Sequence, residues 1–160
     1  HCPWINNCVG FWNRKYFLLL LIYVLIICYL TAIFMAYDFY QVLLWGFNNK
    51  FISKNNEKLS NNILIMMAFI MDCIVCVLMT AFLRFHLKLA RQNKTTIENL
   101  DKQGKPFKSI YDIGASENWK QIFGVNPWLY PFPIFCGSGK PKGDGIYWAT
   151  IQSQQEQLAK

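Results

Sequence analysis

Two long apolar stretches dominate the hydropathy pattern of the chain. The first, residues 16–37, has no charged residue within YFLLLLIYVLIICYLTAIFMAY, and the second, residues 61–83, contains one acid, Asp72. A helix needs about 20 residues to cross a hydrocarbon core of about 30 Å, so each stretch is long enough to span a membrane. The pattern predicts transmembrane helices at 16–37 and 61–85. Burying two such helices in a soluble core would need a larger polar shell than 160 residues supply.

Polar sequence separates and follows the two predicted spans. We expect a short entry segment at 1–15, an irregular, asparagine-rich loop at 38–60 and a tail at 86–160. The tail begins as a continuation of the second helix in FHLKLARQNK. It then becomes rich in proline and glycine in DKQGKPF, FGVNPWLYPFP and CGSGKPKGDG, which predicts ordered turns. The tail is too aromatic to be disordered, so we expect it to pack against the membrane interface or the helix bundle, with a frayed helix over its last ten residues.

The distribution of positive charge predicts the orientation in the membrane. The loop at 38–60 contains three lysines, whereas basic residues gather before the first span and after the second: Arg14, Lys15, Arg84, Lys88, Arg91, Lys94, Lys102, Lys105 and Lys108. Positive charge favours the cytosolic side, so both termini are predicted to be cytosolic and the loop lumenal or extracellular. The net charge of +7 fits attraction to anionic lipid better than a nucleic-acid surface, because the charges are juxtamembrane.

The remaining reactive side chains are six cysteines and one intramembrane acid. The cysteines predict no disulfide framework, because Cys2, Cys8 and Cys136 fall on the reducing side and Cys28, Cys73 and Cys76 fall within spans. The CxxC of Cys73 and Cys76 can signal zinc or redox chemistry, but in the middle of an apolar helix it favours packing. Asp72 is either a functional acid, as in a channel or transporter subunit, or a protonated or hydrogen-bonded acid that faces other helices.

The opening stretch HCPWINNCVG, residues 1–10, carries the most suggestive chemistry. A cysteine becomes a nucleophile when a nearby base, cation or metal stabilises its thiolate. Zinc usually binds four ligands, and this stretch offers at most His1, Cys2 and Cys8. The residues by themselves therefore indicate an incomplete metal or thiol site at a membrane surface.

Three motifs in this order resemble the DHHC-type protein S-acyltransferases. HCPWINNCVG with FWNRKYFLLLLIY is similar to the end of their cysteine-rich domain and the start of their third transmembrane helix. TTIE, residues 95–98, resembles the TTxE motif that follows the fourth helix, and ENWKQIFGVNPWLYPFP with GSGKPKGDG resembles the C-terminal motif. The likeness covers essentially the whole chain. It implies an all-α integral membrane fold of four helices, of which this chain contains the third and fourth.

The resemblance also implies roles for individual residues. Cys2 matches the nucleophile of the signature, while His1 and Cys8 match zinc ligands of a domain that holds two zinc ions when complete. In the TTxE motif, formed here by Thr95, Thr96 and Glu98, Thr96 matches the threonine that contacts the catalytic aspartate. Asn118 matches the asparagine that ties the C-terminal motif to the helix ends.

The first span is expected to line the cavity for the acyl chain. Phe17, Leu20, Val24 and Ile27 recur at helical spacing and could form one wall of that cavity. Ordinary packing against lipid or other helices is an equal alternative for each of these residues.

The implied activity is transfer of a palmitoyl group from palmitoyl-CoA to cytosolic or membrane-associated proteins with free cysteines, through an acyl-enzyme on Cys2. We expect a multi-pass protein of the Golgi or endoplasmic reticulum, with plasma membrane and vacuole or endosome as alternatives. The signature's aspartate and first histidine would precede His1, so the 160 residues alone are expected to be inactive and to be part of a longer enzyme. The alternative from another class is a non-catalytic membrane module that binds partners or lipid.

Overall fold

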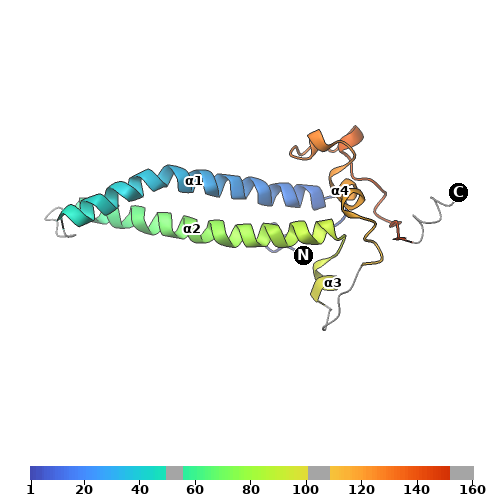
Figure 1. The fold of residues 1–160 in the computed structure, drawn as a ribbon, viewed down its shortest axis with the longest axis horizontal. Coiled ribbons are helices and arrows are strands. Elements are labelled where there is room, and N and C mark those ends of the chain that lie inside the picture. The colour runs from blue at the N-terminus through green and yellow to red at the C-terminus, as the bar shows by residue number, and fades with distance from the viewer. Residues whose placement is uncertain (50–55, 101–108, 152–160) are drawn as a thin grey trace. The chain divides into compact units, whose positions relative to one another are not determined.

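The computed structural model describes residues 1–49, 56–100 and 109–151, and within these ranges it is helical and has no β-strand (Figure 1). This confirms the predicted all-α fold. The elements in chain order are two long α-helices, two short α-helices and two 3-10 turns: α1 (Arg14–Asn49), α2 (Asn56–Arg91), α3 (Thr96–Leu100), α4 (Ala115–Phe123), η1 (Pro127–Leu129) and η2 (Gly137–Gly139).

The two long helices extend beyond the apolar stretches that predicted them. Each has 36 residues and is therefore about 54 Å long, more than the hydrocarbon thickness of a bilayer. The predicted loop at 38–60 is wrong at both ends, because residues 38–49 and 56–60 are helical. Hydropathy marks the apolar part of a helix, whereas the helix continues until the backbone is interrupted, and neither of these segments contains proline.

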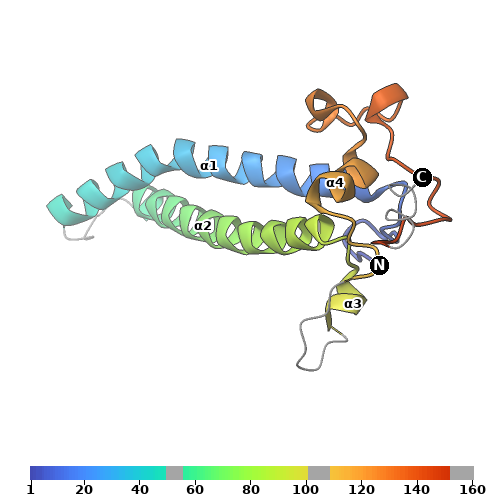
Figure 2. The same cartoon turned by 45° about the vertical axis from the view of Figure 1, so that its right-hand side comes forward.

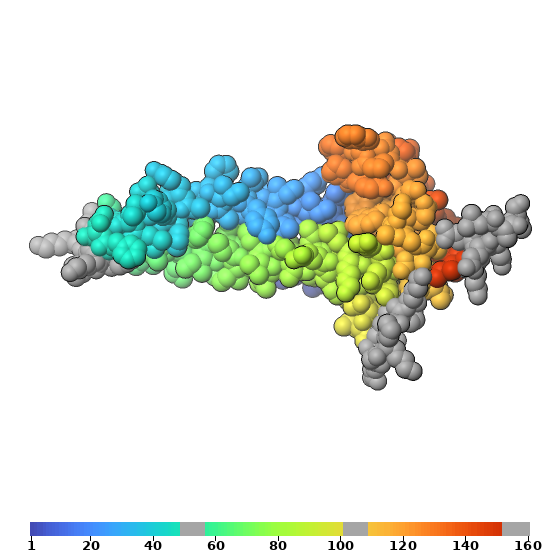
Figure 3. Space-filling view, viewed as in Figure 1, coloured from blue at the N-terminus to red at the C-terminus, as the bar shows by residue number. Residues whose placement is uncertain are grey.

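The chain divides into two compact units. We call residues 1–20 with 83–160 the terminal unit, and residues 21–82 the helix-pair unit. Within the helix-pair unit, α1 and α2 run side by side in opposite directions (Figures 1, 2 and 3). A hydrogen bond of 2.8 Å joins the hydroxyls of Tyr29 and Thr80, and the rings of Phe39 and Phe69 stack with centroids 4.5 Å apart.

The apolar side chains of the helix-pair unit are mostly exposed. Phe34 is 75% exposed and Val77 69%, whereas Val42 and Cys76 are among the few that are buried. Both helices are long and apolar enough to cross a membrane by length and composition. Exposed apolar surface on this scale fits helices that face lipid or other membrane helices.

Asp72 has a partner inside the helix-pair unit. The hydroxyl of Thr31 donates a hydrogen bond of 3.0 Å to its Oδ2 atom. This geometry fits the hydrogen-bonded acid among the two alternatives, and the functional role of Asp72 stays a prediction. Cys76, four residues further along α2, is buried, which fits the packing role predicted for the CxxC.

The terminal unit has a core of its own, formed where the tail packs on the ends of the long helices. Its buried side chains include Leu18, Leu19, Leu89, Ala90, Ile122 and Phe123. Phe123 also meets Trp119 and Tyr130, with ring centroids 5.0 and 5.2 Å apart. The prediction of an ordered, packed tail is confirmed over residues 109–151. DKQGKPF and the last nine residues, where a frayed helical end was predicted, lie outside the described residues.

The end of α2 is fixed by a left-handed asparagine. Asn93 has φ +45°; its N–H donates to the carbonyl of Ala90, and the N–H of Lys94 donates to the carbonyl of Leu89, which together form a Schellman motif. The buried Asn93 amide then donates to the Tyr111 carbonyl and the Gln121 amide oxygen, each at 2.9 Å. One side chain thus ends the helix and holds the tail against it.

Candidate functional site

The opening segment, residues 1–13, folds back on itself around an antiparallel bridge. The N–H of Cys2 donates to the Asn7 carbonyl at 2.9 Å, and the N–H of Asn7 donates to the Cys2 carbonyl at 3.4 Å. The turn between them closes through Asn6, which has φ +47°, a conformation that asparagine tolerates better than most residues. Cys2 therefore sits at a defined position on a tight turn, with its side chain partly exposed.

The same bridge brings two potential zinc ligands together. Pairing Cys2 with Asn7 sets their outer neighbours, His1 and Cys8, opposite each other, and the His1 Nδ1 atom lies 3.5 Å from the Cys8 Sγ atom. In a tetrahedral site with Zn–S bonds of about 2.3 Å and Zn–N bonds of about 2.0–2.1 Å, the sulfur and nitrogen ligands are about 3.5 Å apart. The distance between the His1 and Cys8 atoms therefore fits two ligands of one tetrahedral zinc ion. Within the described residues, no third ligating side chain joins the pair.

Asn13 connects the opening segment to the start of α1. Its amide donates to the Cys8 carbonyl at 2.8 Å, and its Oδ1 atom accepts from the N–H of Gly10 at 2.7 Å. Its own carbonyl accepts from Phe17 in the first turn of the helix. Asn13 therefore ties the segment that carries Cys2 and Cys8 to the first turn of a membrane helix.

The TTxE-like motif forms the start of α3. The Glu98 carboxylate accepts from the backbone N–H of Thr95 at 2.7 Å and from its hydroxyl at 2.9 Å, while the Thr95 hydroxyl accepts from the N–H of Glu98. This is a capping box, in which Thr95 caps the helix and Glu98 closes the reciprocal bond. Thr96 is exposed. The motif therefore fixes a helix end and leaves one threonine accessible.

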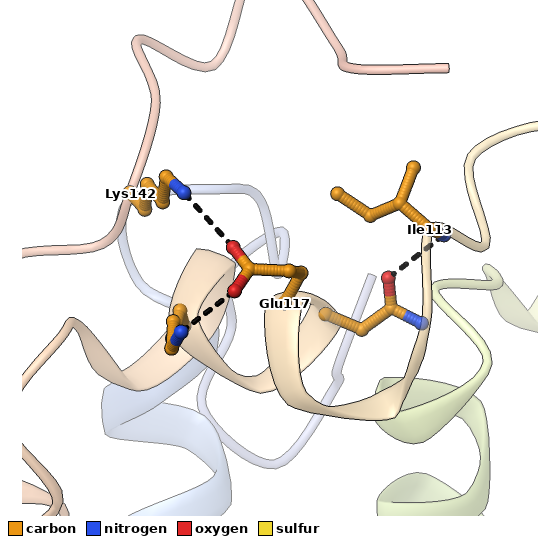
Figure 4. Close-up of polar contacts among 5 residues, drawn as sticks. Ile113, Glu117 and Lys142 are labelled. Atoms are coloured by element: carbon orange, nitrogen blue, oxygen red, sulfur yellow. Dashed lines mark hydrogen bonds and ion pairs between the residues drawn. The ribbon is translucent and has the colours of Figure 1, made fainter. Parts of the chain in front are cut away.

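Asn118 lies at the centre of a buried network that joins α4 to α2. Its side chain has no exposed surface, and its amide donates to the Arg91 carbonyl at 2.8 Å and to Asp112 Oδ1 at 2.7 Å. Its oxygen accepts from the N–H of Ile113 (Figure 4). Arg91 is the last residue of α2, so one asparagine holds the C-terminal motif to the end of a membrane helix.

A second contact holds the GSGKPKGDG segment to α4. The Glu117 carboxylate forms ion pairs with two ammonium groups, that of Lys120 at 2.6 Å and that of Lys142 at 2.9 Å. Figure 4 shows Lys142 pointing toward this carboxylate. The hydrogen bonds from Lys120 and Lys142 hold the pKa of Glu117 below its ordinary value, and the bond to Glu117 raises the pKa of Lys120. The N–H of Lys142 also donates to the Lys120 carbonyl, so both side chain and backbone dock this segment.

This contact predicts an acid-sensitive attachment of the segment 137–142. The pKa of Glu117 is lower in the folded protein than its ordinary value of 4.5. The ionised carboxylate therefore stabilises the folded protein at pH values above 4.5. This stabilisation is lost as the pH falls through the lower pKa of the folded protein. We expect hydrogen exchange in 137–142 to increase over that range, and Glu117→Gln to show the increased exchange already at neutral pH. The carboxylate is partly exposed, so the expected loss is within about 1 kcal/mol. Glu57→Gln, in the helix-pair unit, is the control, and an equal response of both variants would contradict the assignment.

The four residues predicted to line the acyl-chain cavity differ in burial. Phe17 is buried, Leu20 is 43% exposed, Val24 is partly exposed and Ile27 is 59% exposed. The helix-pair unit contains an apolar groove of about 390 Å³ whose lining includes neither Val24 nor Ile27: Phe39, Phe69, Ile70, Cys73, Ile74, Val77 and Leu78. The predicted wall stays a prediction.

Three residues of the terminal unit have structural roles that the sequence did not reveal. Asn13 and Asn93 are asparagines in capping positions, next to the ends of hydrophobic helices, and this placement is the signal that could have identified them. By its sequence position Lys15 is a juxtamembrane charge, but its side chain is fully buried. No sequence signal distinguishes it from an ordinary flanking lysine.

Comparison with known proteins agrees with this arrangement of motifs. The family model for the DHHC palmitoyltransferase domain matches residues 1–103. The chain is 33% identical over 142 residues to palmitoyltransferase ZDHHC15A of Danio rerio, covering 87% of the chain and 40% of that protein. It is 31% identical over 165 residues to palmitoyltransferase ZDHHC2 of Rattus norvegicus, covering 98% of the chain and 40% of that protein.

A third relative, palmitoyltransferase ZDHHC20-B of Danio rerio, is 30% identical over 151 residues, covering 92% of the chain and 43% of that protein. The chain thus spans about two fifths of the length of these relatives. The family match begins at His1 and includes the opening segment, both long helices and the TTxE-like motif. This chain belongs to the DHHC palmitoyltransferase family.

Proposed function

We propose that the protein containing this chain is a protein S-acyltransferase that uses Cys2 as its nucleophile. The Cys2 thiolate attacks the thioester carbonyl of a long-chain acyl-CoA; a new Cys2 thioester forms and the CoA thiolate leaves. A cysteine thiolate of a substrate protein then attacks that thioester, takes the acyl group and releases the Cys2 thiolate. The observation that carries the proposal is the bridge at Cys2, tied through Asn13 to the first turn of α1.

The location of Cys2 fits this chemistry. The tail of an acyl-CoA such as palmitoyl-CoA partitions into the bilayer, so its thioester stays near the membrane surface. Cys2 belongs to the same compact unit as the first turns of α1 and the last turns of α2. A thiol held at this position can meet a lipid thioester and also reach a cytosolic or membrane-associated substrate protein.

His1 and Cys8 are proposed to hold zinc, which the family implies. Their donor atoms, an imidazole nitrogen and a thiolate, are typical zinc ligands, and the 3.5 Å between them fits the site's edge. Zinc bound there would supply folding energy to the opening segment. The zinc ion would then hold the two ends of the turn together through His1 and Cys8, while Asn13 binds the Cys8 carbonyl. Both interactions would restrict the position of Cys2.

The other predicted site residues take supporting roles in this proposal. Thr96, exposed beside the capping box, is the candidate contact for the aspartate of the full signature. Asn118 anchors the C-terminal motif to α2 through the Arg91 carbonyl. Along the first span, Phe17, Leu20, Val24 and Ile27 remain the candidate wall for the acyl chain.

The test of this function is formation of an acyl-enzyme on Cys2. The natural full-length protein is incubated in nanodiscs with palmitoyl-CoA, and the modified peptide is mapped by mass spectrometry. We expect a hydroxylamine-labile palmitoyl group on the peptide that contains Cys2, and its transfer to an added cysteine-containing acceptor. Acylation confined to other cysteines would contradict the proposal and favour a non-catalytic membrane module.

We further propose an orientation in which both termini face the cytosol, in the Golgi or endoplasmic reticulum membrane. A glycan on the sequon Asn93-Lys94-Thr95 would contradict this orientation, because it would place residue 93 on the lumenal side. Cys136 is a better reporter, since its thiol is exposed in the terminal unit. In sealed microsomes whose cytosolic face is outward, a membrane-impermeant maleimide is expected to label Cys136 without permeabilisation. Cys136→Ser is the background control, and labelling that requires permeabilisation would contradict the proposed orientation.

A further inference from the structure

The ammonium group of Lys15 is enclosed by four backbone carbonyl groups. Its Nζ atom lies 2.9–3.4 Å from their oxygens, which belong to Phe123, Leu129, Ile134 and Gly139. The side chain has no exposed surface, and no carboxylate of the described residues lies within ion-pair distance of it. A buried ammonium is costly unless its N–H groups are satisfied, so these carbonyls compensate its charge. We call this arrangement the carbonyl cage.

Three of the four cage carbonyls stand at the ends of helical elements. Phe123, Leu129 and Gly139 are the last residues of α4, η1 and η2 respectively. Carbonyls at helix ends have no intrahelical donor, and the end of α4 also carries partial negative charge. The segment 123–139 therefore folds around a single cation, and that cation belongs to the second residue of α1.

The segment that forms the cage also contacts the opening segment. The Phe135 ring stacks on Tyr16 with centroids 5.6 Å apart and meets the edge of Trp12 at 5.8 Å. The ammonium of Lys140 lies 5.2 Å from the centre of the Trp12 ring. Trp12 directly precedes Asn13, which binds the Cys8 carbonyl. A continuous set of contacts thus runs from the cage to the turn that carries Cys2.

We propose that Lys15 is a positioning residue for acyl transfer, acting through the segment 123–140 on the opening segment. Its ammonium sets the place of this segment against the first turn of α1, and Phe135 and Lys140 then hold Trp12 and the turn behind it. This inference rests on the proposed function of Cys2. A single lysine couples the C-terminal motif to the nucleophile without touching either the thiol or the acyl-CoA.

Single-turnover acylation of the full-length protein separates positioning from folding. The amplitude of Cys2 acylation reports the fraction of folded protein, and the rate constant reports how well the thiol is placed. We expect Lys15→Met, which keeps the length and removes the charge, to lower the rate constant about tenfold to a hundredfold, with a KM for palmitoyl-CoA that changes less. Lys15→Arg keeps the charge and is expected to recover part of the rate. A lower amplitude with an unchanged rate constant would overturn the proposal.

Two further variants complete the test. Lys88→Met is the matched control, because Lys88 is an exposed lysine in the last turn of α2, and its rate constant should match the wild type. Should Lys15→Met fail to fold, Phe135→Ala decides, because it breaks the contact with Trp12 and leaves the cage carbonyls in place. A reduced rate constant in Phe135→Ala supports the proposal, and an unchanged one overturns it.

Hydrogen exchange tests the cage without reference to activity. Lys15→Met should raise exchange of backbone amides in the segment 124–140 by about tenfold or more, while Lys88→Met should not. Unchanged exchange in Lys15→Met would contradict the cage itself. If the wild-type protein forms no acyl-enzyme although the amides of the segment 124–140 exchange slowly, the proposed function is contradicted and the cage is not. The two failures are therefore distinguishable.

Discussion

Cys2→Ser is expected to lower acyl transfer by at least about a thousandfold, because a serine hydroxyl at neutral pH is a far weaker nucleophile than a thiolate. The substitution should leave the local fold intact, since the Cys2–Asn7 bridge uses only backbone atoms. The experiment measures how much palmitate is incorporated into the full-length protein and how much is then transferred to a cysteine-containing acceptor. Normal zinc content in the variant would show that the loss arises from the nucleophile.

Cys136→Ser provides the matched control for this experiment. Cys136 is an exposed free thiol in the same unit, and its replacement should leave transfer within about twofold of the wild type. Comparable losses in the two variants would mean that acylation is not specific to Cys2. Retained transfer in Cys2→Ser would exclude Cys2 as the nucleophile.

Asn118→Ala is expected to destabilise the terminal unit by about 2–4 kcal/mol, because a fully buried side chain and its three hydrogen bonds are lost together. The Arg91 carbonyl and the Asp112 carboxylate each lose a donor, and the N–H of Ile113 keeps only the Tyr111 carbonyl as its acceptor. Asn118→Asp should cost at least as much, since it sets a second carboxylate against Asp112. Thermal unfolding followed by tryptophan fluorescence, together with hydrogen exchange in 109–123, measures the effect.

Asn99→Ala serves as the comparison, because Asn99 lies on α3 and its side chain is only partly buried. Its free energy of unfolding should stay within about 0.5 kcal/mol of that of the wild type. If Asn118→Ala behaves like Asn99→Ala, the Asn118 network does not hold the tail to α2.

Hydropathy predicted the two long helices because a membrane span has to be apolar over its whole crossing length. It did not predict the end of α2, which depends on Asn93 and its left-handed backbone. Nor did it predict the start of α1 after Asn13, whose side chain binds the opening segment. The TTIE motif resembled a family signature, and the structure shows a capping box there as well. A sequence of Thr-x-x-Glu is a general helix-start signal, so this element was within reach of local reasoning.

The opening segment and the carbonyl cage were less predictable for different physical reasons. Residues 1–10 displayed the right chemistry, but adjacent residues rarely aim side chains at each other, and the pairing of His1 with Cys8 depends on a turn. The cage consists of backbone carbonyls more than a hundred residues from Lys15. Every residue has a backbone carbonyl group, so the sequence does not indicate which carbonyl groups will bind a lysine.

The antiparallel bridge at Cys2 imposes a length rule on the opening segment. Four residues, Pro3–Asn6, connect the two bridged residues and form the turn that sets His1 opposite Cys8. A shift of the bridge by one residue would turn the neighbours of the bridged residues to opposite sides. The bridge could then no longer hold His1 beside Cys8, although every reactive side chain would still be present.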